Sequence, residues 1–128
     1  MNKTIWAGRI LSSLSVLFLL FDAGGHLLMP APVVDAFSRL AYPLGLSPAL
    51  GIIQLICVVF YAIPRTSILG AILLTGYLGG AVATHLRVRD PLFDTLFPII
   101  FGVLVWAGFF LRDARLRALI PLTIQKET

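Results

Sequence analysis

The sequence predicts an all-α protein, a four-helix membrane bundle in a single domain over residues 1–128. Hydrophobic residues make up 59% of the chain and charged residues only 12%, whereas a soluble domain carries about 25% charged residues. The mean hydropathy is +0.97. Four apolar segments follow one another along the chain. This composition excludes a soluble enzyme and indicates that the main surroundings of the chain are a lipid bilayer.

The first apolar segment covers residues 5–29 and follows Lys3. A basic start before an apolar run is also typical of a signal peptide, with residues 23–25 in the place of a cleavage site. Because Asp22 interrupts the apolar run and apolar residues resume at Leu27, we expect an uncleaved membrane span.

The second segment, residues 49–63, lies between Pro48 and Pro64. Proline is tolerated in the first turn of a helix and breaks a helix elsewhere, so the two prolines mark its ends. At about 1.5 Å per residue the segment is short for a hydrocarbon core about 30 Å thick. We therefore expect it to extend by a turn or to be shielded by its neighbours. Residues 30–47, which precede it, are expected to form a loop.

The third segment, residues 66–86, begins at Thr66, a candidate N-cap, and is the clearest membrane span. The fourth segment, residues 91–111, follows Asp90, another candidate N-cap. Pro98 should bend this helix in its first third. The basic tail after the fourth segment is expected to lie in the membrane interface or in solvent.

An even number of spans places both termini on one side of the membrane. The side of the termini holds seven basic residues, against three on the other side. By the positive-inside rule, both termini are predicted to be cytoplasmic. The net charge of +4 then reflects membrane orientation, and we expect no nucleic-acid partner. The seven are Lys3, Arg9, Arg65, Arg112, Arg115, Arg117 and Lys126, and the three are Arg39, Arg87 and Arg89.

Polar residues of the spans gather at the end opposite the termini. Asp22 and His26 are four residues apart and share a helix face, which Ser12, Ser15 and Leu19 continue. We predict that this face points into the bundle. Since a carboxylate in a membrane span needs a partner, Asp22 should pair with one of the nearby basic groups, for which the candidates are His26, His85 and Arg87.

Two interpretations of this polar cluster stay open. In the first, Arg87 or Arg89 binds an anionic or carbonyl oxygen of a ligand and a histidine exchanges protons. In the second, an ion pair of Asp22 ties the first span to the third, and His85 and the arginines face water or head groups. Two histidines and a carboxylate could form a metal triad, but their spacing matches no metal motif, so we predict no metal site.

Two further patterns concern helix packing. Gln54, Cys57 and Tyr61 share one face of the second span, where they can line the same pocket or form hydrogen bonds between helices. Gly76 and Gly80 form a GxxxG pattern, which lets another helix backbone approach closely. We expect this pattern to pack inside the bundle, with homodimerisation as the alternative.

The stretch from Tyr61 to Arg87, YAIPRTSILGAILLTGYLGGAVATHLR, and the opening residues 6–11 resemble the DoxX-like family of small four-helix bacterial membrane proteins. The resemblance implies a location in the bacterial cytoplasmic (inner) membrane. Relatives include a thiosulfate:quinone oxidoreductase subunit and other redox-associated membrane proteins. Similar sequences often have Glu where this chain has Gln54, so a proton-relay role does not carry over to that position.

Two functions follow from these observations. The first is binding of a quinone, the one cofactor candidate, or of a similar amphipathic molecule in a polar pocket, with no catalytic residue identified. The second is a non-catalytic assembly subunit that packs against a partner membrane protein or a second copy of the chain. A small solute transporter ranks third, because four spans leave little room for a gated path. The residues proposed to bind the ligand are Asp22, His26, Gln54, His85 and Arg87.

Overall fold

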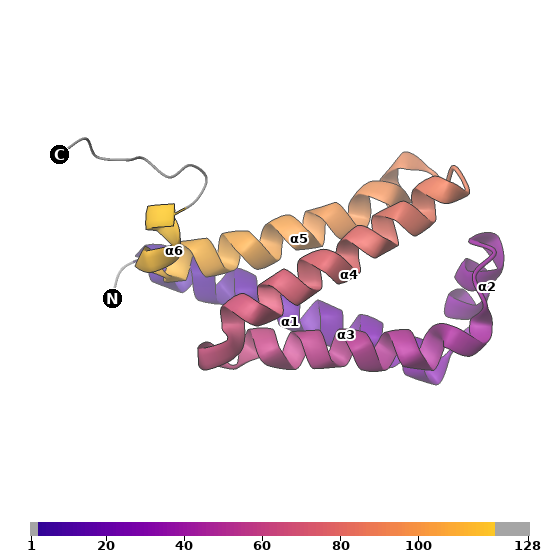
Figure 1. The fold of residues 1–128 in the computed structure, drawn as a ribbon, viewed down its shortest axis with the longest axis horizontal. Helices are drawn as coiled ribbons and strands as arrows, with labels where there is room; N and C mark the ends of the chain where they lie inside the picture. Colours follow the sequence, from indigo (N-terminus) through magenta and orange to yellow (C-terminus); the bar gives the residue numbers. More distant parts are fainter. Residues whose placement is uncertain (1–2, 120–128) are drawn as a thin grey trace.

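The computed structural model of the protein describes residues 3–119, which form helices and turns only (Figure 1). Four of the helices are long and apolar enough to cross a membrane, so the predicted fold class is confirmed. Residues 120–128, with Lys126 and most of the basic tail, lie outside the described residues. The elements are α1 (Lys3–Leu28), α2 (Ala31–Arg39), η1 (Leu44–Leu46), α3 (Ser47–Ala62), η2 (Pro64–Thr66), α4 (Ser67–Arg87), α5 (Leu92–Arg112) and α6 (Ala114–Leu119).

The four membrane-spanning helices α1, α3, α4 and α5 coincide with the four apolar segments of the sequence. The 3-10 turn η1 continues into α3, and together they form a span of 19 residues, longer than the segment between the two prolines. Neither predicted N-cap side chain caps its helix. Thr66 Oγ1 instead donates to the carbonyl of Phe60, 2.8 Å away, and Asp90 binds other side chains.

The four long helices form a closed ring. Helix α1 packs against α3 and α5, and α4 packs against the same two helices from the opposite side. The start of α1 and helix α6 lie together at one end of the bundle, which we call the termini end, and α2 lies at the other, the α2 end (Figure 1). Toward the α2 end the pair α4 and α5 diverges from the pair α1 and α3 (Figure 1).

Glycines allow the closest helix contacts. A Cβ atom added to Gly8 would lie 2.8 Å from the carbonyl oxygen of Gly108, and one added to Gly108 would lie 2.8 Å from the backbone nitrogen of Ser12. Because real Cβ atoms do not come so near, α1 and α5 can cross here only with glycine at both positions. A Cβ at Gly70 would likewise collide with the backbone of Tyr61.

A buried hydrogen-bond network joins all four long helices near the termini end. The guanidinium of Arg112 donates to Oγ of Ser12 at 3.1 Å and to Oγ of Ser67 at 3.0 Å. The hydroxyl of Tyr61 donates to the carbonyl of Val105 at 2.7 Å and accepts from Ser12 at 2.8 Å. Since each donor has an acceptor, the network fixes the helices to one another at this end of the bundle.

The expectation that the GxxxG pattern packs inside the bundle is wrong, and homodimerisation through it stays a prediction. A Cβ atom added at Gly76, Gly79 or Gly80 would meet nothing within 4 Å. The buried stripe of α4 lies on the other side of the helix, and these glycines border the two cavities described below instead of packing against another helix. The residues of that stripe are Ser67, Gly70, Ala71, Leu74 and Leu78.

Helix α2 lies in a segment that we expected to be a loop. It has only nine residues, begins behind Pro30, and buries a single side chain, Phe37. The Phe37 ring makes edge contacts with the rings of His26 and Tyr42, with centroid distances of 5.7 Å and 5.5 Å. These contacts hold α2 across the α2 end of the bundle.

Candidate functional site

A cavity of about 550 Å³ lies at the α2 end and is lined by the four long helices, by α2 and by the turn that follows α2. Its volume is within the range of about 300 to 1,000 Å³ that is usual for small-molecule sites. Most of its wall is apolar or aromatic, and one part is polar. The polar or titratable side chains of that part are Asp22, His26, Tyr42, Tyr77, Thr84 and His85.

The apolar wall contains a group of phenylalanines from α1 and α5. The rings of Phe18 and Phe101 stack with centroids 4.0 Å apart and planes 13° from parallel. Phe97 contacts both edge-on, with centroid distances of 5.5 Å and 5.0 Å. Flat faces and edges of this kind pack well against a planar ring.

Asp22 and His26 lie on α1, one helical turn apart. The Oδ2 atom of Asp22 is 3.5 Å from Nε2 of His26, and the Asp22 side chain is 46% exposed. Of the three predicted partners of Asp22, His26 is the one that lies next to it in the structure. The rest of the predicted face is confirmed, since Ser12, Ser15 and Leu19 are all buried.

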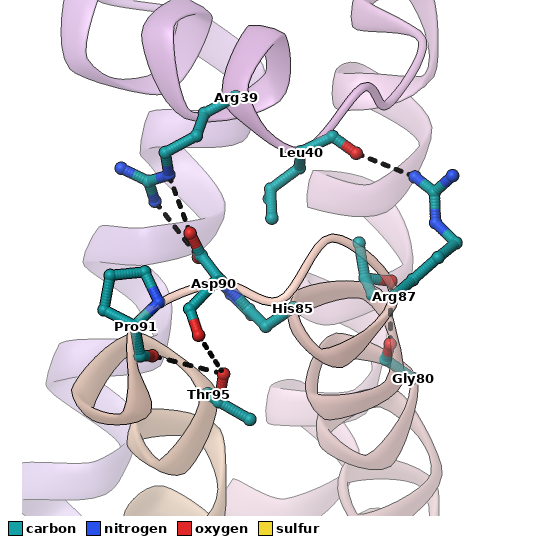
Figure 2. Close-up of polar contacts among 9 residues, drawn as sticks. Arg39, Leu40, Gly80, His85, Arg87, Asp90, Pro91 and Thr95 are labelled. Carbon is teal, nitrogen blue, oxygen red and sulfur yellow. Dashed lines mark hydrogen bonds and ion pairs between the residues drawn. The ribbon is translucent and has the colours of Figure 1, made fainter.

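His85, at the end of α4, is held by a carboxylate. Its Nδ1 atom lies 2.6 Å from Oδ2 of Asp90, whose side chain is only 3% exposed. The other oxygen of Asp90 lies 3.1 Å from Nε of Arg39, which reaches down from α2 (Figure 2). An ionised carboxylate only accepts hydrogen bonds, so it places the proton of a neutral His85 on Nδ1 and leaves Nε2 as an acceptor.

Arg87 does not line the cavity. Its guanidinium donates to the carbonyl of Leu40 at 2.7 Å (Figure 2). It also approaches the carbonyl of Ala41 at 3.4 Å. Ala41 has a φ of 52°, a left-handed conformation that is uncommon for residues other than glycine. Arg87 therefore holds the turn that ends α2, as Arg39 holds the helix itself.

Gln54 reaches the cavity only through a neighbour. The side chain is fully buried in α3, and its Nε2 donates to the carbonyl of Leu19 at 3.2 Å. Its Oε1 accepts a hydrogen bond of 3.2 Å from the hydroxyl of Tyr77, which itself lines the cavity. Gln54 thus orients Tyr77 from behind.

The structure brings Asp22, His26 and His85 to one cavity, with Gln54 behind its wall and Arg87 outside it. The sequence interpretation missed Tyr77, although its spacing of eight residues from His85 puts both on one face of α4. Within residues 3–119 no three histidine, cysteine or acidic side chains are grouped so that they could hold a metal ion.

A second cavity, of about 720 Å³, lies between α4, α5 and α6. Its described lining is apolar except for one pair, in which Nε1 of Trp106 donates to Oγ1 of Thr75 at 2.7 Å. The threonine hydroxyl donates in turn to the carbonyl of Ala71. Because this pair satisfies its own donors, the second cavity offers little to select a polar head group, and the cavity at the α2 end is the candidate site.

The family comparison covers this site. The model of the DoxX-like family matches residues 10–108, a range that includes every residue lining the cavity at the α2 end. No curated protein and no solved structure matches the chain.

Proposed function

Because this chain belongs to the DoxX-like family, we propose that it is a redox-associated membrane protein that binds a quinone or a similar amphipathic molecule in the cavity at the α2 end. One observation carries the proposal: a single cavity combines a phenylalanine wall with two histidines and a carboxylate. A ligand with a planar, polar head and an apolar tail has the same two-part chemistry.

The size and lining of the cavity support a ring-shaped head group. About 550 Å³ accommodates a substituted six-membered ring with part of a tail. The stacked rings of Phe18 and Phe101 offer a flat apolar surface to the head group. Oxygen atoms on the ring would then meet the polar side, where Asp22 and His85 lie.

Imidazole is the side chain that proteins most often use for proton exchange, and the cavity is lined by two of them. His85 is oriented by Asp90 and His26 lies beside Asp22. A carboxylate beside an imidazole fixes its tautomer and its orientation, as in general acid–base sites. These two pairs are the chain's means of exchanging protons with a bound head group.

The location that we propose is the inner membrane of a bacterium, with both termini cytoplasmic and the cavity in the outer half of the bundle. The support is the excess of basic residues that the order of the spans in the sequence assigns to the side of the termini, seven against three, under the positive-inside rule.

A second candidate function is that of a non-catalytic assembly subunit. The observation in its favour is the face of α4 that carries Gly76, Gly79 and Gly80, where an added Cβ atom would meet nothing within 4 Å. Small residues that no helix of the bundle covers let the helix of another protein, or of a second copy, approach closely.

Co-purification of a quinone tests the first proposal. We expect protein purified in mild detergent to carry a quinone, detected by chromatography of an organic extract. Ala81→Phe, which fills the cavity from α4, should lower the bound quinone at least about tenfold, equivalent to about 1.4 kcal/mol. Ala83→Phe is the matched control, because Ala83 is exposed on the same helix and lines neither cavity.

A wild-type protein that carries no quinone and takes up none of an added decyl-substituted benzoquinone would contradict the first proposal. A protein partner that co-elutes in a fixed ratio, and is lost in Gly79→Leu but kept in Ala81→Phe, would support the second. Melting temperatures of all variants in the same detergent establish that they are folded.

A further inference from the structure

The cavity at the α2 end offers a ligand more hydrogen-bond acceptors than donors. Each polar side chain of its wall can be assigned as donor or acceptor from the bonds it already makes within the protein. Most of the donors turn out to be used inside the protein, and most of the groups left for a ligand are acceptors.

Two hydroxyl groups of the wall already donate their protons to acceptors within the protein. The Tyr77 hydroxyl donates to Oε1 of Gln54 at 3.2 Å, and the Thr84 hydroxyl donates to the carbonyl of Gly80 at 2.8 Å. Each hydroxyl has one proton, so what Tyr77 and Thr84 have left to offer a ligand is oxygen lone pairs.

The carboxylate and imidazole groups of the wall also offer mainly acceptors to a ligand. A carboxylate can only accept, and the Asp22 carboxylate is 46% exposed and lines the cavity. Neutral His85 carries its proton on Nδ1 toward Asp90, so the Nε2 atom left for a ligand is an acceptor. His26 is flanked by Oγ of Ser47 at Nδ1 and by Asp22 at Nε2, each at 3.5 Å.

Two arginines at this end of the bundle, which could act as donors, are already bound to groups of the protein. Arg39 binds Asp90, and Arg87 binds the carbonyl oxygen of Leu40 (Figure 2). Arg87 also approaches the carbonyl oxygen of Ala41, and neither arginine lines the cavity. Among the described lining residues, the hydroxyl of Tyr42 is the group that can serve as donor or acceptor without giving up one of these bonds.

From this balance we infer that the site selects the reduced form of its ligand, an aromatic diol such as a benzoquinol, over the corresponding quinone. The inference rests on the proposed function and names the redox form that is bound. A quinol has two hydroxyl protons to give to Asp22 and His85. The oxygens of a quinone only accept, so in this cavity they would face the lone pairs of the wall, with Tyr42 as the one uncommitted donor.

The same balance disfavours an anionic head group. A carboxylate ligand would face the Asp22 carboxylate with no arginine in the wall to neutralise it. An alkylammonium ligand would also satisfy acceptors, but it has no flat ring to cover the phenylalanine wall.

Calorimetric titration of the purified protein in lipid nanodiscs tests the inference. The probes are a decyl-substituted benzoquinol kept reduced, the matching benzoquinone, decylammonium and 4-decylbenzoate, at about pH 8, where free imidazole is neutral. We expect the quinol to bind at least about tenfold more tightly than the quinone, the factor for one hydrogen bond, and more tightly than the other two probes.

Variants show whether the acceptors cause the preference. Asp22→Asn brings an amide donor into the wall, so the quinol preference should shrink about tenfold. Asp35→Asn is the control, because Asp35 is exposed on α2 and does not line the cavity. It removes the same charge and should leave the preference unchanged.

The outcomes separate this inference from the proposed function. Quinone binding that equals or exceeds quinol binding would overturn the inference and leave quinone binding intact, as would a quinol preference that survives both Asp22→Asn and His85→Gln. Tighter binding of decylammonium than of quinol would overturn it in favour of a cation site. If neither quinol nor quinone binds, the proposed function itself fails.

Discussion

Asp90 connects His85 to helix α2: one of its carboxylate oxygens lies 2.6 Å from the imidazole, and the other lies 3.1 Å from the guanidinium of Arg39. The carboxylate is almost fully buried, whereas the Arg39 side chain is 53% exposed. One acidic group thus orients a histidine of the cavity and also attaches the short helix that covers it.

The first prediction follows from this shared carboxylate. Asp90→Asn removes the charge from a buried position and leaves His85 with a weaker acceptor, so we expect a loss of about 2 kcal/mol in the free energy of unfolding. Arg39→Gln should cost less than about 1 kcal/mol, because the arginine is half exposed and its charge is screened. Reversible unfolding in mixed micelles measures both, and equal losses in the two variants would contradict the burial argument.

The second prediction concerns the crossing of α1 and α5. Gly108→Ala places a Cβ atom 2.8 Å from the backbone nitrogen of Ser12, so the helices must move apart, at a cost of about 1 to 3 kcal/mol. Gly79→Ala is the control on α4, where an added Cβ meets nothing within 4 Å, and it should leave stability unchanged or slightly raise it. Thermal unfolding in one detergent compares the two, and equal losses would argue against the close crossing.

The third prediction tests membrane orientation. In a Cys57→Ala background, Ser38→Cys on α2 should react with a membrane-impermeant thiol reagent added to intact cells from the periplasmic side. Ala118→Cys, which is exposed on α6 at the termini end, should react only after the membrane is opened. The physical reason is the charge asymmetry between the two ends of the bundle. The reverse labelling pattern would contradict this orientation and would mean that the cavity faces the cytoplasm.

The fourth prediction concerns pH and helix α6. The Asp113 carboxylate accepts hydrogen bonds from the backbone and side chain of Arg115, which lower the pKa of Asp113 below its usual value. A lowered folded-state pKa means that the stabilisation is present at neutral pH and is lost as the pH falls through that lowered pKa. Amide exchange in α6, corrected for its intrinsic pH dependence, should therefore increase below about pH 4. In Asp113→Asn the exchange should already be faster at neutral pH and should lack this change.

The membrane helices were predictable because each one corresponds to a long run of apolar residues. Apolar runs of this length, with Pro48 and Pro64 between them, are incompatible with a soluble domain and specify four helices almost by themselves. The buried face of α1 followed from its three- and four-residue spacing for the same reason, since Ser12, Ser15 and Leu19 all lie inside the bundle.

The parts that could not be predicted depend on contacts between distant segments. Nine residues are too few for a periodic pattern to distinguish α2 from a loop, so the bond from Arg39 to Asp90 could not be inferred. The GxxxG pattern indicates that a backbone can be approached, but it does not say from which side. On α4 the buried stripe that packs against other helices lies on another face, and Gly76 and Gly80 border the cavity at the α2 end.

The last prediction separates a binding role of Asp22 from a structural one. Its contact with His26 is 3.5 Å long and nearly half of its side chain is exposed, so the pair contributes little to stability. Both Asp22→Asn and Asp22→Ala should lower the free energy of unfolding by less than about 1 kcal/mol. A buried ion pair between spans would instead cost about 3 to 5 kcal/mol when one partner is removed.

Ligand binding should respond differently from stability. If the Asp22 carboxylate accepts a hydrogen bond from the head group, binding of a decyl-substituted benzoquinol should weaken about tenfold or more in both variants. Thermal unfolding and calorimetric titration of the same preparations give the two quantities side by side. A large loss of stability in both variants would assign Asp22 to the framework of the bundle. Wild-type melting together with wild-type binding would mean that Asp22 is only exposed at the rim, and the cavity would then lose its most accessible acceptor.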